Sequence, residues 1–184
     1  TNDNPDELMV GFCVDDSLTN VVIPDEINGK TVTGISDFAF KNGVDEHGLP
    51  LPSNLTSIVI PDTVTTIGNA AFYGCTNLTS IVIPDSVTTI GAGAFYQCSS
   101  LSSIELPDSL TSIEFYAFVN CNSLTSIVIP DSVTYISSAA FGACVSLTSI
   151  YIPSSVTTID ASAFAGCENL TIYCEASSKP AGWS

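Results

Sequence analysis

Cysteine is the most reactive side chain that recurs at a fixed interval in this 184-residue chain. Of the seven cysteines, five are spaced 23 residues apart: Cys75, Cys98, Cys121, Cys144 and Cys167. If the repeated segments stack as neighbouring strands about 4.8 Å apart, successive Cα atoms come within disulfide range. Parallel segments, however, aim their Cβ atoms in the same direction, and Cys suits a tight apolar corner. The spacing therefore predicts a column of free, buried thiols, with a disulfide or a bound metal as alternatives.

Metal and catalytic chemistry find little support elsewhere in the sequence. No C-x-x-C pair is present and the single histidine, His47, lies in an irregular segment, so the ligand spacing of a zinc site is absent. General acid–base catalysis most often uses His, and anion clamps favour Arg, but the chain has one His and no Arg. We therefore predict no metal, no cofactor and no catalytic residues, and expect that the chain is not an enzyme.

Carboxylates form a second recurring set, in which each follows a proline directly. Four aspartates at the 23-residue interval could hold calcium, a cation that prefers several oxygen ligands. The alternative is that each short Asp side chain bonds backbone N–H groups of a turn. We favour the turn. The set comprises Asp62, Asp85, Asp108 and Asp131, and Ser154 takes the next place.

The elements that must position these side chains follow from the repeat itself. The pattern L-x-S-I-x-[IL]-P-[DS]-[ST]-[VL]-T-x-I, followed by A-F-x-x-C, begins at Leu55, Leu78, Leu101, Leu124 and Leu147. The alternation in T-S-I-V-I-P predicts a strand with one buried side, and V-T-T-I predicts a second short strand. One unit cannot bury its apolar side chains alone, so stacked copies would place like on like in columns along a solenoid.

The outward positions of the longer strand form a candidate binding surface. Alternation sends the two Ile side chains inward and the residue between them outward. Strand propensity alone explains exposed Val and Tyr, but an apolar column that ends in two tyrosines also suits a protein partner or a stacked sugar. The candidate ligand-binding residues are Val59, Val82, Glu105, Val128, Tyr151 and Tyr173, with Val22 in line. Tyr73, Tyr96 and Tyr116 decorate the A-F segments, where surface packing is the default interpretation.

The repeat divides the chain into four parts. Residues 1–17 are predicted to form an N-terminal cap, 18–54 an irregular first repeat, 55–169 five regular repeats and 170–184 a C-terminal cap. The first repeat has five extra residues between Pro24 and Val32 and nine between Phe40 and Leu55, and we expect loops at both insertions. The second insertion carries His47 and is either a recognition loop or a surface excursion.

The unit resembles the 23-residue leucine-rich repeat of the BspA-like, treponemal-type family of bacterial secreted and surface proteins. The I-x-I-P…A-F-x-x-C spacing carries the resemblance, which covers about 18–174. It implies a mostly β, right-handed leucine-rich-repeat solenoid with short parallel strands and little helix, an extracellular or cell-surface location, and a non-catalytic role in binding or adhesion. Where the general leucine-rich pattern has Asn, this chain has Thr63, Ser86, Ser109, Ser132 and Ser155.

The charge of the chain restricts its partners. The chain has three basic and nineteen acidic residues, which gives a formal net charge of −16. Nucleic acid and other polyanions should therefore be repelled. Every apolar run is interrupted by Pro, Gly, Asp or Ser, so no membrane span is predicted. We expect a protein partner, such as a host extracellular-matrix or cell-surface protein. A structural spacer or display scaffold, and self-association through the apolar column, are the alternatives.

Overall fold

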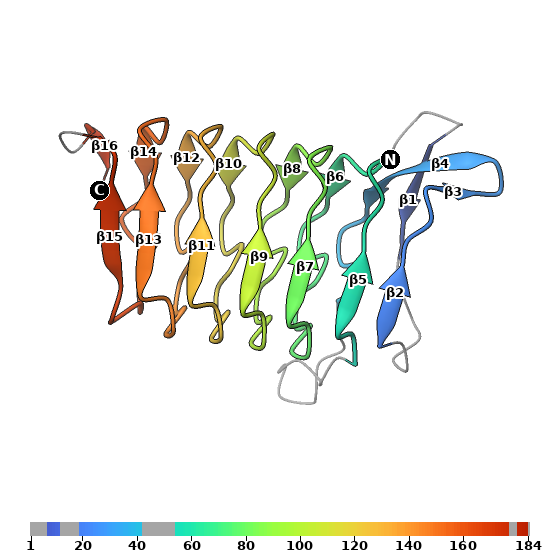
Figure 1. Ribbon diagram of the computed structural model, residues 1–184, viewed down its shortest axis with the longest axis horizontal. Coiled ribbons are helices and arrows are strands. Elements are labelled where there is room, and N and C mark those ends of the chain that lie inside the picture. Colours follow the sequence, from blue (N-terminus) through green and yellow to red (C-terminus); the bar gives the residue numbers. More distant parts are fainter. Residues whose placement is uncertain (1–6, 12–18, 42–53, 177–179, 184) are drawn as a thin grey trace.

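The chain winds into a parallel β-solenoid, in which each 23-residue unit makes one turn (Figure 1). The computed structural model describes residues 7–11, 19–41, 54–176 and 180–183. Over these residues it contains strands and turns but no helix. The predicted solenoid of short parallel strands with little helix is thus confirmed.

Each turn contributes one longer and one shorter strand, as the alternation in the sequence predicts. The longer strands are β2 (Asn20–Val22), β5 (Ser57–Val59), β7 (Ser80–Val82), β9 (Ser103–Glu105), β11 (Ser126–Val128), β13 (Ser149–Ile152) and β15 (Thr171–Cys174). The shorter strands are β6 (Thr66–Ile67), β8 (Thr89–Ile90), β10 (Ser112–Ile113), β12 (Tyr135–Ile136), β14 (Thr158–Ile159) and β16 (Gly182–Trp183). The two series form separate sides of the solenoid (Figure 1).

Strand pairing keeps equivalent positions of successive units side by side. In the longer series, Ile127 pairs with Ile150 and Ile150 with Ile172, all in parallel register. In the shorter series, Ile67 pairs with Ile90 in the same way. Because the sequence period equals one turn, the parallel ladder stacks identical side chains on one another.

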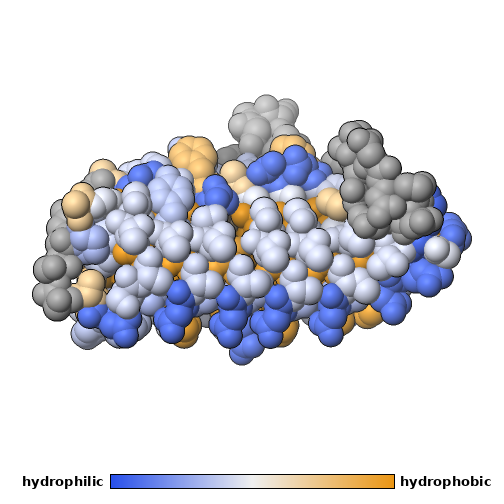
Figure 2. All heavy atoms as spheres, turned by 90° about the horizontal axis from the view of Figure 1, so that it is seen from above, coloured by the Kyte–Doolittle hydropathy of each residue, from blue (hydrophilic) through white to orange (hydrophobic). Residues whose placement is uncertain are grey.

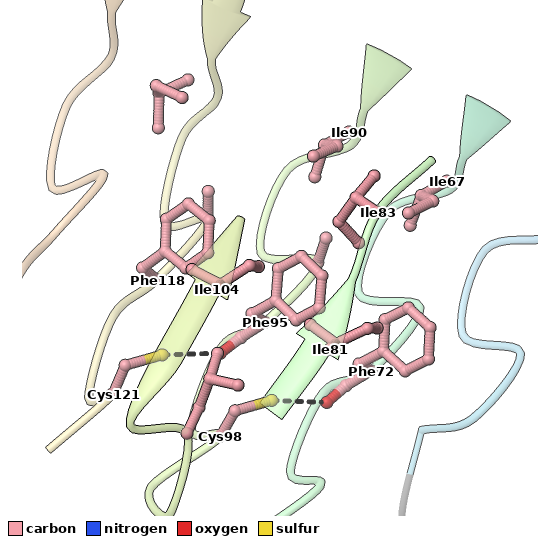
Figure 3. Packing of buried hydrophobic residues seen from close by; sticks show 14 of the residues in the cluster. Ile67, Phe72, Ile81, Ile83, Ile90, Phe95, Cys98, Ile104, Phe118 and Cys121 are labelled. Atoms are coloured by element: carbon pink, nitrogen blue, oxygen red, sulfur yellow. Dashed lines mark hydrogen bonds between the residues drawn. The ribbon is translucent and has the colours of Figure 1, made fainter. Parts of the chain in front are cut away.

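The core consists of side-chain columns that run along the solenoid axis. The phenylalanine of each A-F pair stacks on its neighbours with ring centroids 5.3–5.5 Å apart and interplanar angles of 2–6°. Figure 3 shows three of these rings, Phe72, Phe95 and Phe118, beside the inward Ile side chains. Most rings, Ile side chains and small Ala side chains in these columns are fully buried, so the A-F segment returns to the interior as predicted.

The A-F segments form a third hydrogen-bonded side that the sequence did not indicate. Around Phe72, the N–H groups of Ala70, Phe72 and Gly74 donate to carbonyl oxygens of the following unit at 2.8–2.9 Å. Next to the shorter strands, single hydrogen bonds run the other way, as where the N–H of Thr88 donates to Thr65 of the preceding unit. Positive φ recurs on each side of the Phe, two residues before it (Phe38, Ala70, Gly93, Tyr116 and Ala139) and two residues after it (Gly74, Gln97, Asn120, Ala143 and Gly166).

The N-terminal end differs from the expectation of a loop at the first insertion. The extra residues form a β-hairpin, in which β3 (Glu26–Ile27) pairs antiparallel with β4 (Lys30–Ile35). Asn28 and Gly29 have φ of 54° and 77°, the two-residue turn that Asn-Gly favours, so the dipeptide was the missed signal. Strand β1 (Glu7–Val10) lies parallel to β4 on its other side. The second insertion falls in residues 42–53, outside the described residues.

The two sides of the C-terminal end are covered unequally. On the shorter-strand side, β16 pairs with β14, and the Trp183 indole N–H donates to the Val156 carbonyl at 3.0 Å. On the longer-strand side, the inward residue Ile172 of β15 is 43% exposed, whereas the equivalent Ile150 is 2% exposed. The last longer strand therefore has a core-facing side chain that nothing in the described chain covers.

Candidate functional site

The structure places all the predicted ligand-binding residues at the outward position of the longer strands, which lie side by side and are hydrogen-bonded in three ladders (Figure 1). We call this surface the long-strand face. Pairing places Val22 beside Val59, Val82 beside Glu105, and Val128 beside Tyr151 and then Tyr173. Each apolar member of the face is 51–77% exposed, and Glu105 is exposed as well. The face consists of Val22, Val59, Val82, Glu105, Val128, Tyr151 and Tyr173.

The long-strand face is apolar along its centre and hydroxylated along one edge. In the five regular units, the residue before the inward Ile is an exposed Ser that begins the strand, as in Ser57 of β5. At the N-terminal end, the Ser57 hydroxyl donates to the Asn20 side-chain oxygen at 2.6 Å. A row of Val and Tyr next to a row of Ser combines apolar area with hydrogen-bonding groups, which is the composition of a protein-binding surface.

The shorter-strand side is chemically uniform by comparison. Seen from this side, pale residues of intermediate hydropathy form rows along the solenoid, with hydrophilic residues along one edge (Figure 2). Beside the shorter strands, four Thr hydroxyls each donate to a carbonyl of the preceding unit at 3.2–3.3 Å, those of Thr65, Thr88, Thr134 and Thr157. These hydroxyls join successive units, so we assign this side a role in stabilising the solenoid.

The repeated cysteines lie in the core, as predicted, and none forms a disulfide with another described cysteine. Cys75, Cys98, Cys121 and Cys144 are fully buried, and Cys167, in the last unit, is partly buried. Each Sγ points along the axis and donates to the Phe carbonyl of the preceding unit at 3.0–3.3 Å, two of these bonds being drawn in Figure 3. Burial raises the pKa of the Cys121 thiol to about 12, which keeps it protonated and unreactive at neutral pH.

The repeated aspartates do not bond the turns as the sequence suggested. Asp62, Asp85, Asp108 and Asp131 are exposed, and the turns close through the backbone, as where the Val64 N–H donates to Pro61 at 3.0 Å. Nor do three acidic, His or Cys side chains gather as metal ligands anywhere in the described chain. A carboxylate does bind the turn at Ser154, whose N–H donates to Glu175 at 2.8 Å and lowers the pKa of Glu175.

The hydroxyl that replaces the usual Asn of leucine-rich repeats joins neighbouring units. Ser86, Ser109 and Ser132 each donate to the carbonyl oxygen of a Val or Leu in the preceding unit at 2.6 Å. At the two ends of this row, the hydroxyls of Thr63 and Ser155 are buried without a hydrogen-bond partner. The interior members of the row therefore hold the turns together in place of an Asn ladder.

A continuous set of aromatic side chains lies on the A-F side, and sequence reasoning recognised only its tyrosines. Tyr73 and Tyr96 stack with centroids 5.1 Å apart, Tyr96 contacts Tyr116 at 6.0 Å, and Tyr116 stacks on Phe115 at 3.7 Å. Toward the N-terminus, the Lys41 ammonium lies over the rings of Phe38 and Tyr73. We call these residues the aromatic stripe: Phe38, Lys41, Tyr73, Tyr96, Phe115 and Tyr116.

Two further points complete the inventory of candidate sites. His47 and the rest of the insertion that was considered as a recognition loop lie outside the described residues. In the described part of the chain, no helix has the length and apolar character needed to cross a membrane.

A parallel solenoid with a 23-residue period and Leu- and Ile-lined turns is a leucine-rich-repeat protein. The model of the family described as "BspA type Leucine rich repeat region (6 copies)" matches residues 51–171. The chain therefore belongs to the BspA-type leucine-rich-repeat family, as the resemblance indicated. A search of curated protein sequences finds no significant match.

Three solved structures illustrate the similarity. A Treponema pallidum leucine-rich-repeat protein, TpLRR, is 31% identical with a TM-score of 0.78, over 93% of this chain and 75% of that one. A leucine-rich cell surface protein of Faecalibacterium prausnitzii is 31% identical with a TM-score of 0.62, over 92% of this chain and 53% of that one. A Bacteroides ovatus leucine-rich-repeat protein is 31% identical with a TM-score of 0.62, over 86% and 45%. This chain thus spans about half the length of the last two.

Proposed function

We propose that this chain is a non-catalytic protein-binding module of a secreted or cell-surface bacterial protein, and that the long-strand face contacts the partner. The observation that carries the proposal is the exposed apolar column, in which each residue is more than half exposed and lies at the outward position of a longer strand: Val22, Val59, Val82, Val128, Tyr151 and Tyr173. A row of this kind exceeds the isolated apolar residues that are normal on a protein surface. Tyrosines are also enriched among residues that dominate binding energy.

Family membership supports the surface location and the binding role. A structural relative from Faecalibacterium prausnitzii is described as a cell surface protein. Repeat solenoids commonly bind through an extended surface shared by many units, so the contact would consist of many small interactions. Host extracellular-matrix and cell-surface proteins are the partner class that we propose to test first.

The test removes the two tyrosines of the face. We expect Tyr151→Ser with Tyr173→Ser to weaken binding to an array of purified extracellular-matrix proteins by about tenfold or more, because exposed tyrosines act as binding hot spots. The matched control is Val145→Ser, which also removes an exposed apolar side chain, but from a turn outside both the long-strand face and the aromatic stripe. Circular dichroism and thermal melting should show that both variants remain folded.

Three results would count against the proposal. Equal loss in both variants would mean that the contact does not depend on the long-strand face. Absence of binding to any matrix protein would favour the structural spacer. A wild-type dimer in light scattering, converted to monomer by the tyrosine substitutions, would assign the face to self-association.

A further inference from the structure

The aromatic stripe is a surface that the repeat does not require. Before the A-F pair, the positions equivalent to Phe38 and Tyr116 hold Ala70, Gly93 and Ala139. Residue type here therefore varies from Gly to Tyr while the backbone hydrogen bonds recur. The fold accepts small residues at these positions, so the large rings must be explained by something other than the solenoid.

Two aromatic residues of the stripe also have an unfavourable backbone conformation. Phe38 and Tyr116 both have φ of 59°, a left-handed conformation that is a genuine outlier for a bulky residue. The solenoid imposes this conformation in other units too, where Ala70, Gly93 and Ala139 occupy the position, so a bulky residue here adds strain that a small one would reduce. The Phe38 and Tyr116 side chains remain 43% and 41% exposed, so the strain does not serve to bury them.

One end of the aromatic stripe already contacts a cationic side chain of the protein itself. The Lys41 ammonium lies 5.2 Å from the Phe38 ring centroid and 5.5 Å from that of Tyr73, within the range of a cation–π interaction. The rest of the stripe, from Tyr96 to Phe115, has no ammonium group of its own. Phe115 follows Glu114, a half-buried carboxylate that accepts a hydrogen bond from Ser112 at 2.6 Å.

We propose that the aromatic stripe binds an extended, basic peptide segment of a partner protein, with an Arg or Lys side chain of that segment over the Tyr116 and Phe115 rings. The complementarity of charge supports a cationic occupant, since the chain carries a net charge of −16 and contains no Arg. The stripe crosses four units, or about 15 Å at strand spacing, a length matched by about five extended residues. This surface is separate from the long-strand face and does not depend on it.

The experiment measures fluorescence anisotropy of a labelled peptide of alternating Arg and Gly at physiological ionic strength. The control peptide has citrulline in place of Arg, which keeps the size and removes the charge. We expect the Arg peptide to bind about tenfold more tightly than the citrulline peptide. Phe115→Ser with Tyr116→Asn should weaken it by about fivefold, because the rings are lost while every charge of the protein is retained. Asn tolerates the positive φ of Tyr116, so the variant should fold, and Phe115→Ser alone provides a milder substitution.

The remaining outcomes separate this proposal from its rivals. Tyr151→Ser with Tyr173→Ser should leave peptide binding unchanged, so the stripe and the long-strand face can fail independently. Equal binding of the Arg peptide by wild type and the Phe115/Tyr116 variant would overturn the proposal, because net charge alone would then suffice. Binding of a neutral oligosaccharide in preference to the Arg peptide would overturn it in favour of sugar stacking.

Discussion

At the scale of single residues, the cysteine column shows why a side chain that is usually chosen for its reactivity can recur as a core residue. Each inner corner has room for a small side chain and also presents a Phe carbonyl that a donor can reach, as Cys121 reaches Phe95 at 3.2 Å. A thiol meets both needs, because it is small and apolar yet is a weak donor. At the last pair the thiols also interact with each other, because a side-chain hydrogen bond with Cys144 lowers the pKa of the partly buried Cys167 to about 7.

The buried thiols should make stability depend on pH in the alkaline range. Burial raises the pKa of Cys121 from 9.0 to about 12, so the folded protein holds this proton more tightly than the unfolded chain does. The stabilisation is complete below about pH 9 and is lost as the pH rises toward 12. For this thiol we expect a loss of about 1.4 kcal/mol of unfolding free energy per pH unit in that window. Urea unfolding at a series of pH values measures the slope.

Cys121→Ala is the control for this pH dependence. The variant lacks the thiol, so its unfolding free energy should fall less steeply with pH above about pH 9. The two slopes should differ by about 1.4 kcal/mol per pH unit. Tyr73, whose pKa burial and Tyr96 raise, contributes equally to both proteins, because Cys121 is not among the causes of its shift. Parallel slopes for the two proteins would contradict the assignment to Cys121.

At the scale of elements, the two strands of each unit were predictable and the third side was not. Alternation of apolar and polar residues announces a strand, as in β5 and β6, because it reports directly which side chains are buried. The A-F segment depends instead on positive φ at residues such as Ala70 and Ala143, and Ala gives no sign of that conformation. The hairpin of β3 and β4 does carry a signal, the Asn-Gly dipeptide between its two strands.

The third side should become more stable when its backbone is relieved of strain. Ala143 has φ of 54°, while Gly74 and Gly166 occupy the equivalent position in other units. Ala143→Gly removes the clash of Cβ with the backbone and should stabilise the protein by about 1 kcal/mol. Ala140→Gly, three residues earlier, is the matched control: Ala140 is buried and does not have positive φ, so the change should destabilise by about 1 kcal/mol. Chemical denaturation of both variants measures the difference, and destabilisation by Ala143→Gly would contradict the argument.

At the scale of the molecule, the candidate site could be located from sequence only where it repeats. The long-strand face follows from the period, so each of its members could be named in advance and lies in the expected column. The aromatic stripe departs from the period: Phe115 and Phe38 have no aromatic counterpart in the next unit, and Lys41 joins the rings only through folding. The repeated part of a sequence therefore predicts the solenoid and the surfaces that its period aligns. Surfaces formed by residues outside the period can be recognised only in the structure.

The stack should open from its ends. Each unit contacts only its neighbours, so an inner unit has two interfaces and an end unit has one. The core-facing Ile172 of β15 is 43% exposed, against 6% for Ile104 of β9, so the last longer strand has the least burial to lose. Hydrogen exchange measured by mass spectrometry should therefore be slowest in β7, β9 and β11 and fastest in β15. Ile172→Ser should alter exchange little, because this side chain is already largely exposed. Ile104→Ser should accelerate exchange throughout the central units, because Ile104 is buried. Uniform protection from β7 to β15 would mean instead that the solenoid opens as one cooperative block.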